Sequence, residues 1–172
     1  PDGKPFLIII RYTNSGIADE IDSVTGLHTE TILVKKIEDY VINRHQSALM
    51  KIGLDQFSHI NVMYGAAFAD KILNCVAQSF IRVLNGKGSV YRLSGAKFVI
   101  TFDNISRDEI IDIHNNITDT LSNLIEVEGK KIPLKTSAGA IFIEPYMKET
   151  NAIRSRLTYA LNHSREEHHG DL

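Results

Sequence analysis

The chain has a single cysteine and almost no net charge, and both scarcities exclude classes of protein. Cys75 cannot form an internal disulfide, and its place in an apolar helical pattern is typical of a packed residue in a reducing compartment. The formal charge of −2 over 172 residues comes without the clustered basic surface that nucleic acids require, so no nucleic-acid partner is expected. No apolar run reaches the roughly 18 residues that span a bilayer. The composition therefore predicts one soluble globular domain.

The start of the chain lacks the cationic leader and apolar stretch of a secretory signal. We expect a cytoplasmic fragment without membrane contact of its own, whose parent protein is free to carry an anchor elsewhere. Residues 6–11 read as one strand, which needs a partner ladder. We therefore predict that 1–16 close an upstream module similar to a PAS sensor domain, that 17–24 form a linker, and that 25–172 form the main domain.

Beyond residue 30, helical and strand periodicities alternate. Ser106 and Glu109 have the spacing of a capping box, which predicts the start of a helix. The predicted helices cover 30–45, 56–64, 68–84, a segment after 106 and 149–167, and the predicted strands cover 47–54, 90–93, 98–102 and 132–143. This order indicates an α+β fold, an α/β sandwich in which helices pack on a central sheet that contains an antiparallel hairpin.

Four motifs occur in a fixed order from residue 22 onward. They are Asp-Ser-Val-Thr-Gly-Leu at 22–27, a run at 55–73 that begins Asp-Gln-Phe-Ser-His-Ile-Asn, Arg-Leu-Ser-Gly-Ala-Lys-Phe at 92–98, and Thr-Ser-Ala-Gly at 136–139. Together they resemble GGDEF domains, the family that condenses two GTP molecules into cyclic di-GMP. The resemblance implies a nucleotide-cyclase palm-like fold, with a central, mostly antiparallel sheet of about five strands flanked by helices.

The acidic residues of the family signature are replaced in this chain. The resemblance implies that the family's metal-binding Asp falls on Gly53, and that the third and fourth signature residues fall on Ala96 and Lys97. Gly and Ala side chains offer Mg²⁺ no oxygen ligand, and a lysine repels it. Because phosphoryl transfer depends on such ions to neutralise charge, we expect no catalytic residue, no bound metal and no Mg²⁺ requirement. Such a degenerate site is not expected to convert GTP.

Two further charged residues, Glu30 and Arg165, lie at or near positions where the family has an Arg and a Lys. An Arg expected eight residues after Asp22 is Glu30, which we expect to repel Asp22. Arg165 lies near a phosphate-contacting Lys of the family, but Glu166 and Glu167 beside it favour a solvated helix face.

The base-reading side of the family site is retained. The resemblance implies that Asn61 and Asp70 read the guanine edge, for which an amide and a carboxylate are suited. The backbone N–H groups of Gln56 and Phe57 open a short helix and are able to hold phosphate, and Lys97 supplies a counter-charge. These residues predict GTP binding without a metal. The alternative is that Asn61 caps a turn and that Asp70 and Lys97 are solvated.

Three classes of function remain open. We favour a catalytically inactive GGDEF domain of bacterial cyclic di-GMP signalling, with GTP as a candidate ligand and no cofactor. Its expected partners are an upstream PAS-like sensor, a downstream output such as an EAL phosphodiesterase, and a second copy in a homodimer. The second class is an active diguanylate cyclase with atypical metal ligands. The third is a ferredoxin-like domain that shares only the fold.

Overall fold

The computed structural model describes residues 20–44, 46–123 and 125–169. The strand predicted over 6–11, and with it the whole segment 1–16, lies outside them. The elements in chain order are β1 His28–Thr29, α2 Glu30–Asn43, β2 Ser47–Leu54, α3 Phe57–Tyr64, α4 Ala66–Leu84, β3 Ser89–Arg92, β4 Lys97–Asp103, α5 Arg107–Asn123, β5 Glu126–Val127, β6 Lys130–Lys131, β7 Thr136–Ile143 and α6 Thr150–His169.

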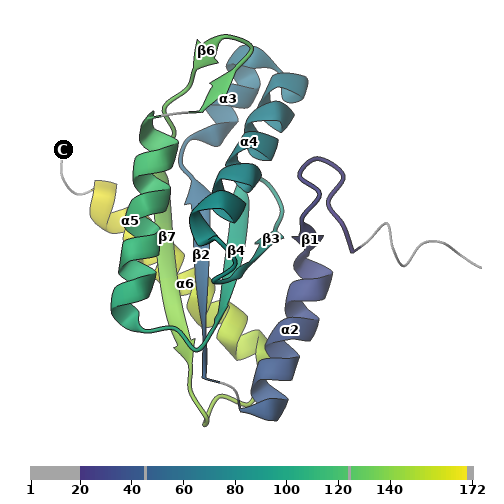
Figure 1. Ribbon diagram of the computed structural model, residues 1–172, viewed down its shortest axis with the longest axis vertical. Helices are drawn as coiled ribbons and strands as arrows, with labels where there is room; N and C mark the ends of the chain where they lie inside the picture. The colour runs from purple at the N-terminus through teal and green to yellow at the C-terminus, as the bar shows by residue number, and fades with distance from the viewer. Residues whose placement is uncertain (1–19, 45, 124, 170–172) are drawn as a thin grey trace, which may run out of the picture.

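A five-stranded sheet in the order β1-β3-β4-β2-β7 forms the centre of the domain (Figure 1). The short β1 runs parallel to β3, and every other neighbouring pair is antiparallel. This arrangement confirms the predicted α+β fold with a mostly antiparallel central sheet. Strand β2 pairs on both sides, with β4 and β7, which explains why seven of its eight residues are buried.

Helices cover both faces of the sheet (Figure 1). On one face α4 and α5 pack their apolar stripes against β2 residues such as Met50 and Ile52. On the other face α2 and α6 pack against a smaller cluster that includes Leu49 and Val99. Residues 49, 51 and 53 of β2 share this second face because side chains alternate along a strand. The α2/α6 face therefore determines what lies over position 53.

The predicted capping box forms at the start of α5. The Ser106 backbone N–H donates to a Glu109 carboxylate oxygen at 3.0 Å, and the Glu109 N–H donates back to the Ser106 hydroxyl at 3.3 Å. These hydrogen bonds to Ser106 lower the pKa of Glu109. The reciprocal bonds satisfy two backbone donors at the helix start, as the sequence spacing predicts.

The predicted strand over 132–143 starts too early. Strand β7 begins at Thr136, because Pro133 lacks the backbone N–H that a paired strand needs. A separate two-stranded hairpin, β5–β6, precedes it and turns at Glu128 and Gly129, both at positive φ. Two strands of two residues each are too short to give a periodic pattern, and the sequence analysis missed this hairpin.

Among the described residues, no helix is both long and apolar enough to cross a membrane.

Candidate functional site

The hairpin at 94–98, onto which the resemblance places the family signature, lies at the end of the central strands. Gly53 of β2 is directly opposite Lys97 of β4, and the two residues therefore share the face of the sheet that α6 covers. The Leu54 N–H donates to the Ala96 carbonyl at 2.9 Å, which fixes the hairpin tip against the end of β2. The structure thus brings together the three positions, 53, 96 and 97, for which the family resemblance implies acidic residues.

Arg92 holds the hairpin in place. Its guanidinium donates to the backbone carbonyls of Gly95 and Lys97, the latter at 3.0 Å, and lies over the Phe98 ring with Cζ 4.7 Å from the centroid. Arg92 is only 7% exposed, and this burial lowers its pKa, while the nearby carboxylates of Asp22 and Asp70 act in the opposite direction. The buried arginine therefore holds the backbone of the 94–98 hairpin in place.

Arg165 of α6 covers Gly53. A Cβ built on Gly53 would lie 3.1 Å from the Arg165 Cζ and would overlap the Nη2 atom. The Arg165 Nε lies 3.3 Å from the Oδ1 atom of Asp55, an ion pair between two half-buried side chains. The expectation of a solvated helix face is thus wrong for Arg165, since the side chain turns inward onto the sheet.

Close packing of α6 on β7 explains why Arg165 reaches this point. A Cβ at Gly139 would overlap the backbone between Ala160 and Leu161, so the helix axis lies very near the strand. Gly139 pairs with Lys51, two strand positions before the Gly53–Ser137 pair. Arg165 follows Ala160 by five residues, a little more than one helical turn, and therefore comes level with Gly53.

Asp55 is the carboxylate that remains beside the hairpin. Its Oδ2 atom accepts a hydrogen bond from the Ser137 hydroxyl at 2.8 Å, and its backbone N–H donates to the Lys135 carbonyl at 2.9 Å. Together with Arg165 these contacts engage Asp55 within the protein. Among the described residues, no group of three or more His, Cys, Asp or Glu side chains is placed to hold a metal ion.

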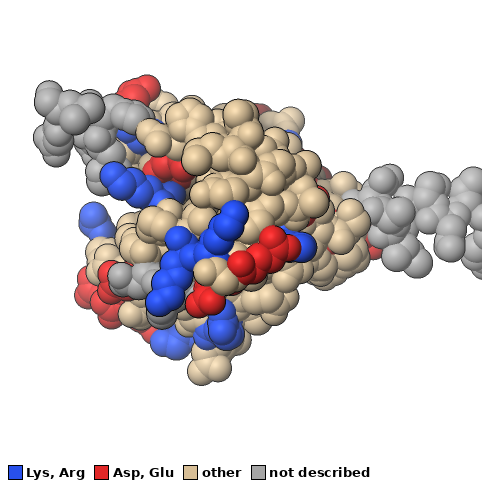
Figure 2. Space-filling model, turned by 90° about the horizontal axis from the view of Figure 1, so that it is seen from above, with Lys and Arg blue, Asp and Glu red and all other residues tan. Residues whose placement is uncertain are grey.

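The surroundings of Arg165 are rich in cations. Lys51, between Leu49 and Gly53 on the same face, donates from Nζ to the Thr158 hydroxyl at 2.9 Å. Burial lowers the pKa of Lys51, and the positive charge of Lys97 adds to the effect. Seen from the end of the molecule that carries α3 and the β5–β6 hairpin, Lys and Arg side chains form a band beside a shorter acidic group (Figure 2).

Glu30, for which repulsion of Asp22 was expected, has a partner of opposite charge. It forms an ion pair with Arg154 of α6. The Asp22 carboxylate instead accepts hydrogen bonds from the Thr25 backbone N–H at 2.8 Å and from the Thr25 hydroxyl at 2.7 Å. The turn before β1 is therefore stabilised by its own side chains.

The predicted base-reading residues lie on α3 and α4. Asn61 and Asp70 are both exposed, and Asp70 lies near enough to Arg92 to act on its pKa. Gln56 adopts a left-handed backbone with φ of 53° and directly precedes α3, which Phe57 begins. The Asn61 backbone carbonyl accepts a hydrogen bond from the Gly65 N–H at 2.9 Å. Asp70 thus lies within electrostatic range of Arg92, and Gln56 and Phe57 follow Asp55 directly.

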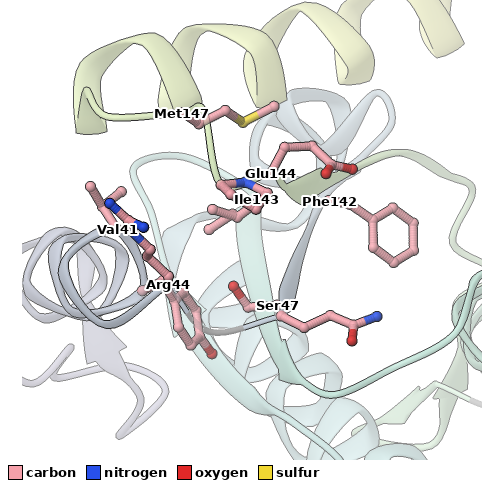
Figure 3. Close-up of a pocket in the computed structure, with 10 residues that line it drawn as sticks. Val41, Arg44, Ser47, Phe142, Ile143, Glu144 and Met147 are labelled. Atoms are coloured by element: carbon pink, nitrogen blue, oxygen red, sulfur yellow. The ribbon is translucent and has the colours of Figure 1, made fainter.

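A separate hollow of about 280 Å³ lies at the other end of β2, beside Ser47. Arg44 reaches it from the end of α2, and Glu144 and Met147 reach it from the segment before α6 (Figure 3). None of the residues predicted for the nucleotide site lines it. It is distinct from the region around Gly53.

The fold and the hairpin identify the class of protein. The family model described as "Diguanylate cyclase, GGDEF domain" matches residues 19–170, and the chain belongs to this family. It is a GGDEF domain of cyclic di-GMP signalling.

Comparison with individual proteins supports the fold and shows how much of each relative this chain covers. The GGDEF domain of FimX from Pseudomonas aeruginosa superimposes with a TM-score of 0.77 at 17% identity, over 86% of this chain and 94% of that one. The diguanylate cyclase SiaD of the same organism, solved in complex with its activator SiaC, superimposes with a TM-score of 0.77 at 17% identity. This match covers 90% of this chain and 62% of that one. The oxygen sensor protein DosP of Escherichia coli is 26% identical over 120 residues, 70% of this chain. The chain spans about 15% of the length of DosP.

Proposed function

We propose that this GGDEF domain is catalytically inactive and acts as a regulatory module that is able to bind GTP without converting it. The observation that carries the proposal is the position of the Arg165 guanidinium over Gly53, directly across from Lys97. Positions for which the family resemblance implies acidic metal ligands thus have one positive side chain on the neighbouring strand and another from α6 above Gly53. A divalent ion there would lack oxygen ligands and would be repelled by both cations.

The remaining carboxylate does not rescue such a site. Asp55 already accepts a hydrogen bond from Ser137 and pairs with Arg165. Recruiting Asp55 to a metal would leave the half-buried guanidinium without its counter-charge, which is unfavourable away from bulk water. Without ions to orient the attacking hydroxyl and neutralise the phosphates, condensation of two GTP molecules loses its main source of catalysis.

The proposed setting is a larger bacterial signalling protein in the cytoplasm. A PAS-like sensor before this domain and an EAL-type phosphodiesterase after it would supply the input and the output. Two relatives support a regulatory role: DosP is an oxygen sensor of which the matched segment is a small part, and SiaD forms a complex with an activator protein. In this role, GTP binding would change how the domain contacts its output partner or a second copy of itself.

Incubation with GTP and either Mg²⁺ or Mn²⁺ tests the proposal. We expect no cyclic di-GMP by liquid chromatography and mass spectrometry, with an active diguanylate cyclase as the positive control. Metal-dependent cyclic di-GMP formation that is abolished in Asn61→Ala or Asp70→Ala would overturn the proposal. It would establish instead an active cyclase with atypical ligands.

A further inference from the structure

Arg165 occupies the space of a missing side chain. The built Cβ of residue 53 overlaps its Nη2 atom, so the guanidinium and any larger residue at position 53 exclude each other. The arginine is held there rather than trailing in solvent, since its side chain is 30% exposed and Asp55 pairs with its Nε edge. The site therefore contains a fixed cation supplied by the protein.

The charges around this cation favour an anion. Lys97 faces the same side of the sheet as Gly53, and Lys51 lies close enough for the positive charge of Lys97 to lower its pKa. Arg154 and Arg165 act on Lys51 in the same direction, and the carboxylate of Glu30, which is paired with Arg154, acts against them. Asp55 is the carboxylate paired within this group, and it offsets only part of the positive charge. A phosphate placed beside Lys97 and Arg165 would relieve their mutual repulsion.

We propose that Arg165 and Lys97 form a phosphate-binding site in which the guanidinium replaces the divalent ion, so that a guanine nucleotide binds in its metal-free form. A guanidinium presents a planar set of N–H donors that matches two phosphate oxygens, and an ammonium adds a compact point charge. The inference rests on the proposed function, because it requires that no metal occupies the position over Gly53.

The site predicts an unusual response to Mg²⁺. In a metal-dependent site the ion lies between protein carboxylates and phosphate, and its removal abolishes binding. Here Mg²⁺ neutralises the phosphates in solution and adds a positive charge that Arg165 and Lys97 repel. Binding is therefore no weaker with EDTA than with excess Mg²⁺.

A purely structural role for Arg165 makes a different prediction. If Arg165 served only to pair with Asp55, then Asp55→Asn and Arg165→Ala would change the affinity for GTP in similar ways. For a phosphate ligand they differ, because Asp55→Asn removes a competing negative charge and leaves the guanidinium in place. GTP then binds to Asp55→Asn at least as tightly as to the wild-type chain.

Isothermal titration with GTP in EDTA and in excess Mg²⁺ tests the proposal. We expect binding in EDTA, and Arg165→Ala to weaken it about tenfold, the loss typical of one charged hydrogen-bonding group. Arg156→Ala on the same helix is the matched control and leaves the affinity unchanged. Arg165→Lys keeps a cation without the planar donors and gives a smaller loss, which can be measured even if the alanine variant folds poorly.

Three results would overturn the inference: GTP binding that requires Mg²⁺, an Arg165→Ala variant with wild-type affinity, or no binding of GTP up to about 1 mM in EDTA. None of these restores catalysis, so the proposed inactive domain would stand. Formation of cyclic di-GMP by the wild-type chain is the separate result that defeats the proposed function.

Discussion

The guanidinium of Arg165 and the bare Cα of Gly53 are complementary: the Arg165 Cζ lies 3.1 Å from the point that a Cβ on residue 53 would occupy. Glycine at this position leaves room for the arginine, and the arginine supplies a positive charge where the family resemblance implies an acid. The two residues come from β2 and from α6, elements that are far apart in the sequence. This complementarity connects the residue at position 53, where the family resemblance implies a metal ligand, with the packing of α6.

Restoring the acidic residues alone is predicted to fail. In Gly53→Asp combined with Ala96→Asp and Lys97→Glu, the side chain added at position 53 displaces the Arg165 guanidinium, which then pairs with the new carboxylates from beside them in place of a metal. Adding Arg165→Ala removes this internal cation, and Mn²⁺ affinity then rises at least about tenfold above that of the triple variant. Calorimetric titration with Mn²⁺ compares the two proteins. Equal Mn²⁺ affinity would show that Arg165 does not compete with the metal.

Gly139→Ala is predicted to destabilise the domain by about 1–3 kcal/mol, because the added methyl overlaps the backbone between Ala160 and Leu161. Urea unfolding measures the change. Ala140→Ser, at an exposed position of the same strand, is the control and alters stability by less than about 0.5 kcal/mol. A neutral Gly139→Ala would mean that α6 does not pack this closely on β7.

The capping box gives a pH-dependent prediction. Hydrogen bonds from Ser106 lower the pKa of Glu109 in the folded state below its ordinary value of 4.5. A carboxyl group with a lowered folded pKa stabilises the protein above its unfolded pKa, and this contribution is lost as the pH falls through the folded pKa. Glu109→Gln should therefore be less stable than the wild type at pH 7, and this difference in stability should become smaller below about pH 4. Thermal unfolding across this range measures the difference, and a constant difference would contradict the prediction.

The base-reading assignment of Asn61 and Asp70 remains a prediction that nucleotide preference can test. If Asp70 accepts hydrogen bonds from the guanine edge, the wild-type domain prefers GTP to ATP, and Asp70→Ala reduces this preference about tenfold without changing its affinity for pyrophosphate. Lys71→Ala, the neighbouring exposed residue on α4, is the control. Equal binding of GTP and ATP by the wild-type domain would remove the assignment.

Local sequence patterns predicted most of the fold. Strand β2 spans 47–54 as its apolar run predicts, and the Ser106–Glu109 spacing located the start of α5. The family motifs alone predicted that Gly53, Ala96 and Lys97 share a site, and the strand register places Gly53 opposite Lys97. These features are encoded within a few residues of one another or within a recognisable motif.

The role of Arg165 could not be predicted in the same way. Its neighbours in the sequence, Glu166 and Glu167, suggested a solvated face, whereas its position depends on the close approach of α6 to Gly139. The small residues at 53 and 139 were the available signal, since both face the last helix across the sheet. Interpreting that signal required the strand register, which is a property of the fold and not of any local segment.

Electron paramagnetic resonance of Mn²⁺ in the presence of GTP tests the central claim most directly, because it reports whether a divalent ion joins protein and nucleotide. The wild-type domain is predicted to leave the Mn²⁺ spectrum that of the nucleotide complex in solution, with no ion immobilised on the protein. An immobilised Mn²⁺ signal that depends on GTP and disappears in Asp55→Asn would contradict the claim that Arg165 has replaced the metal.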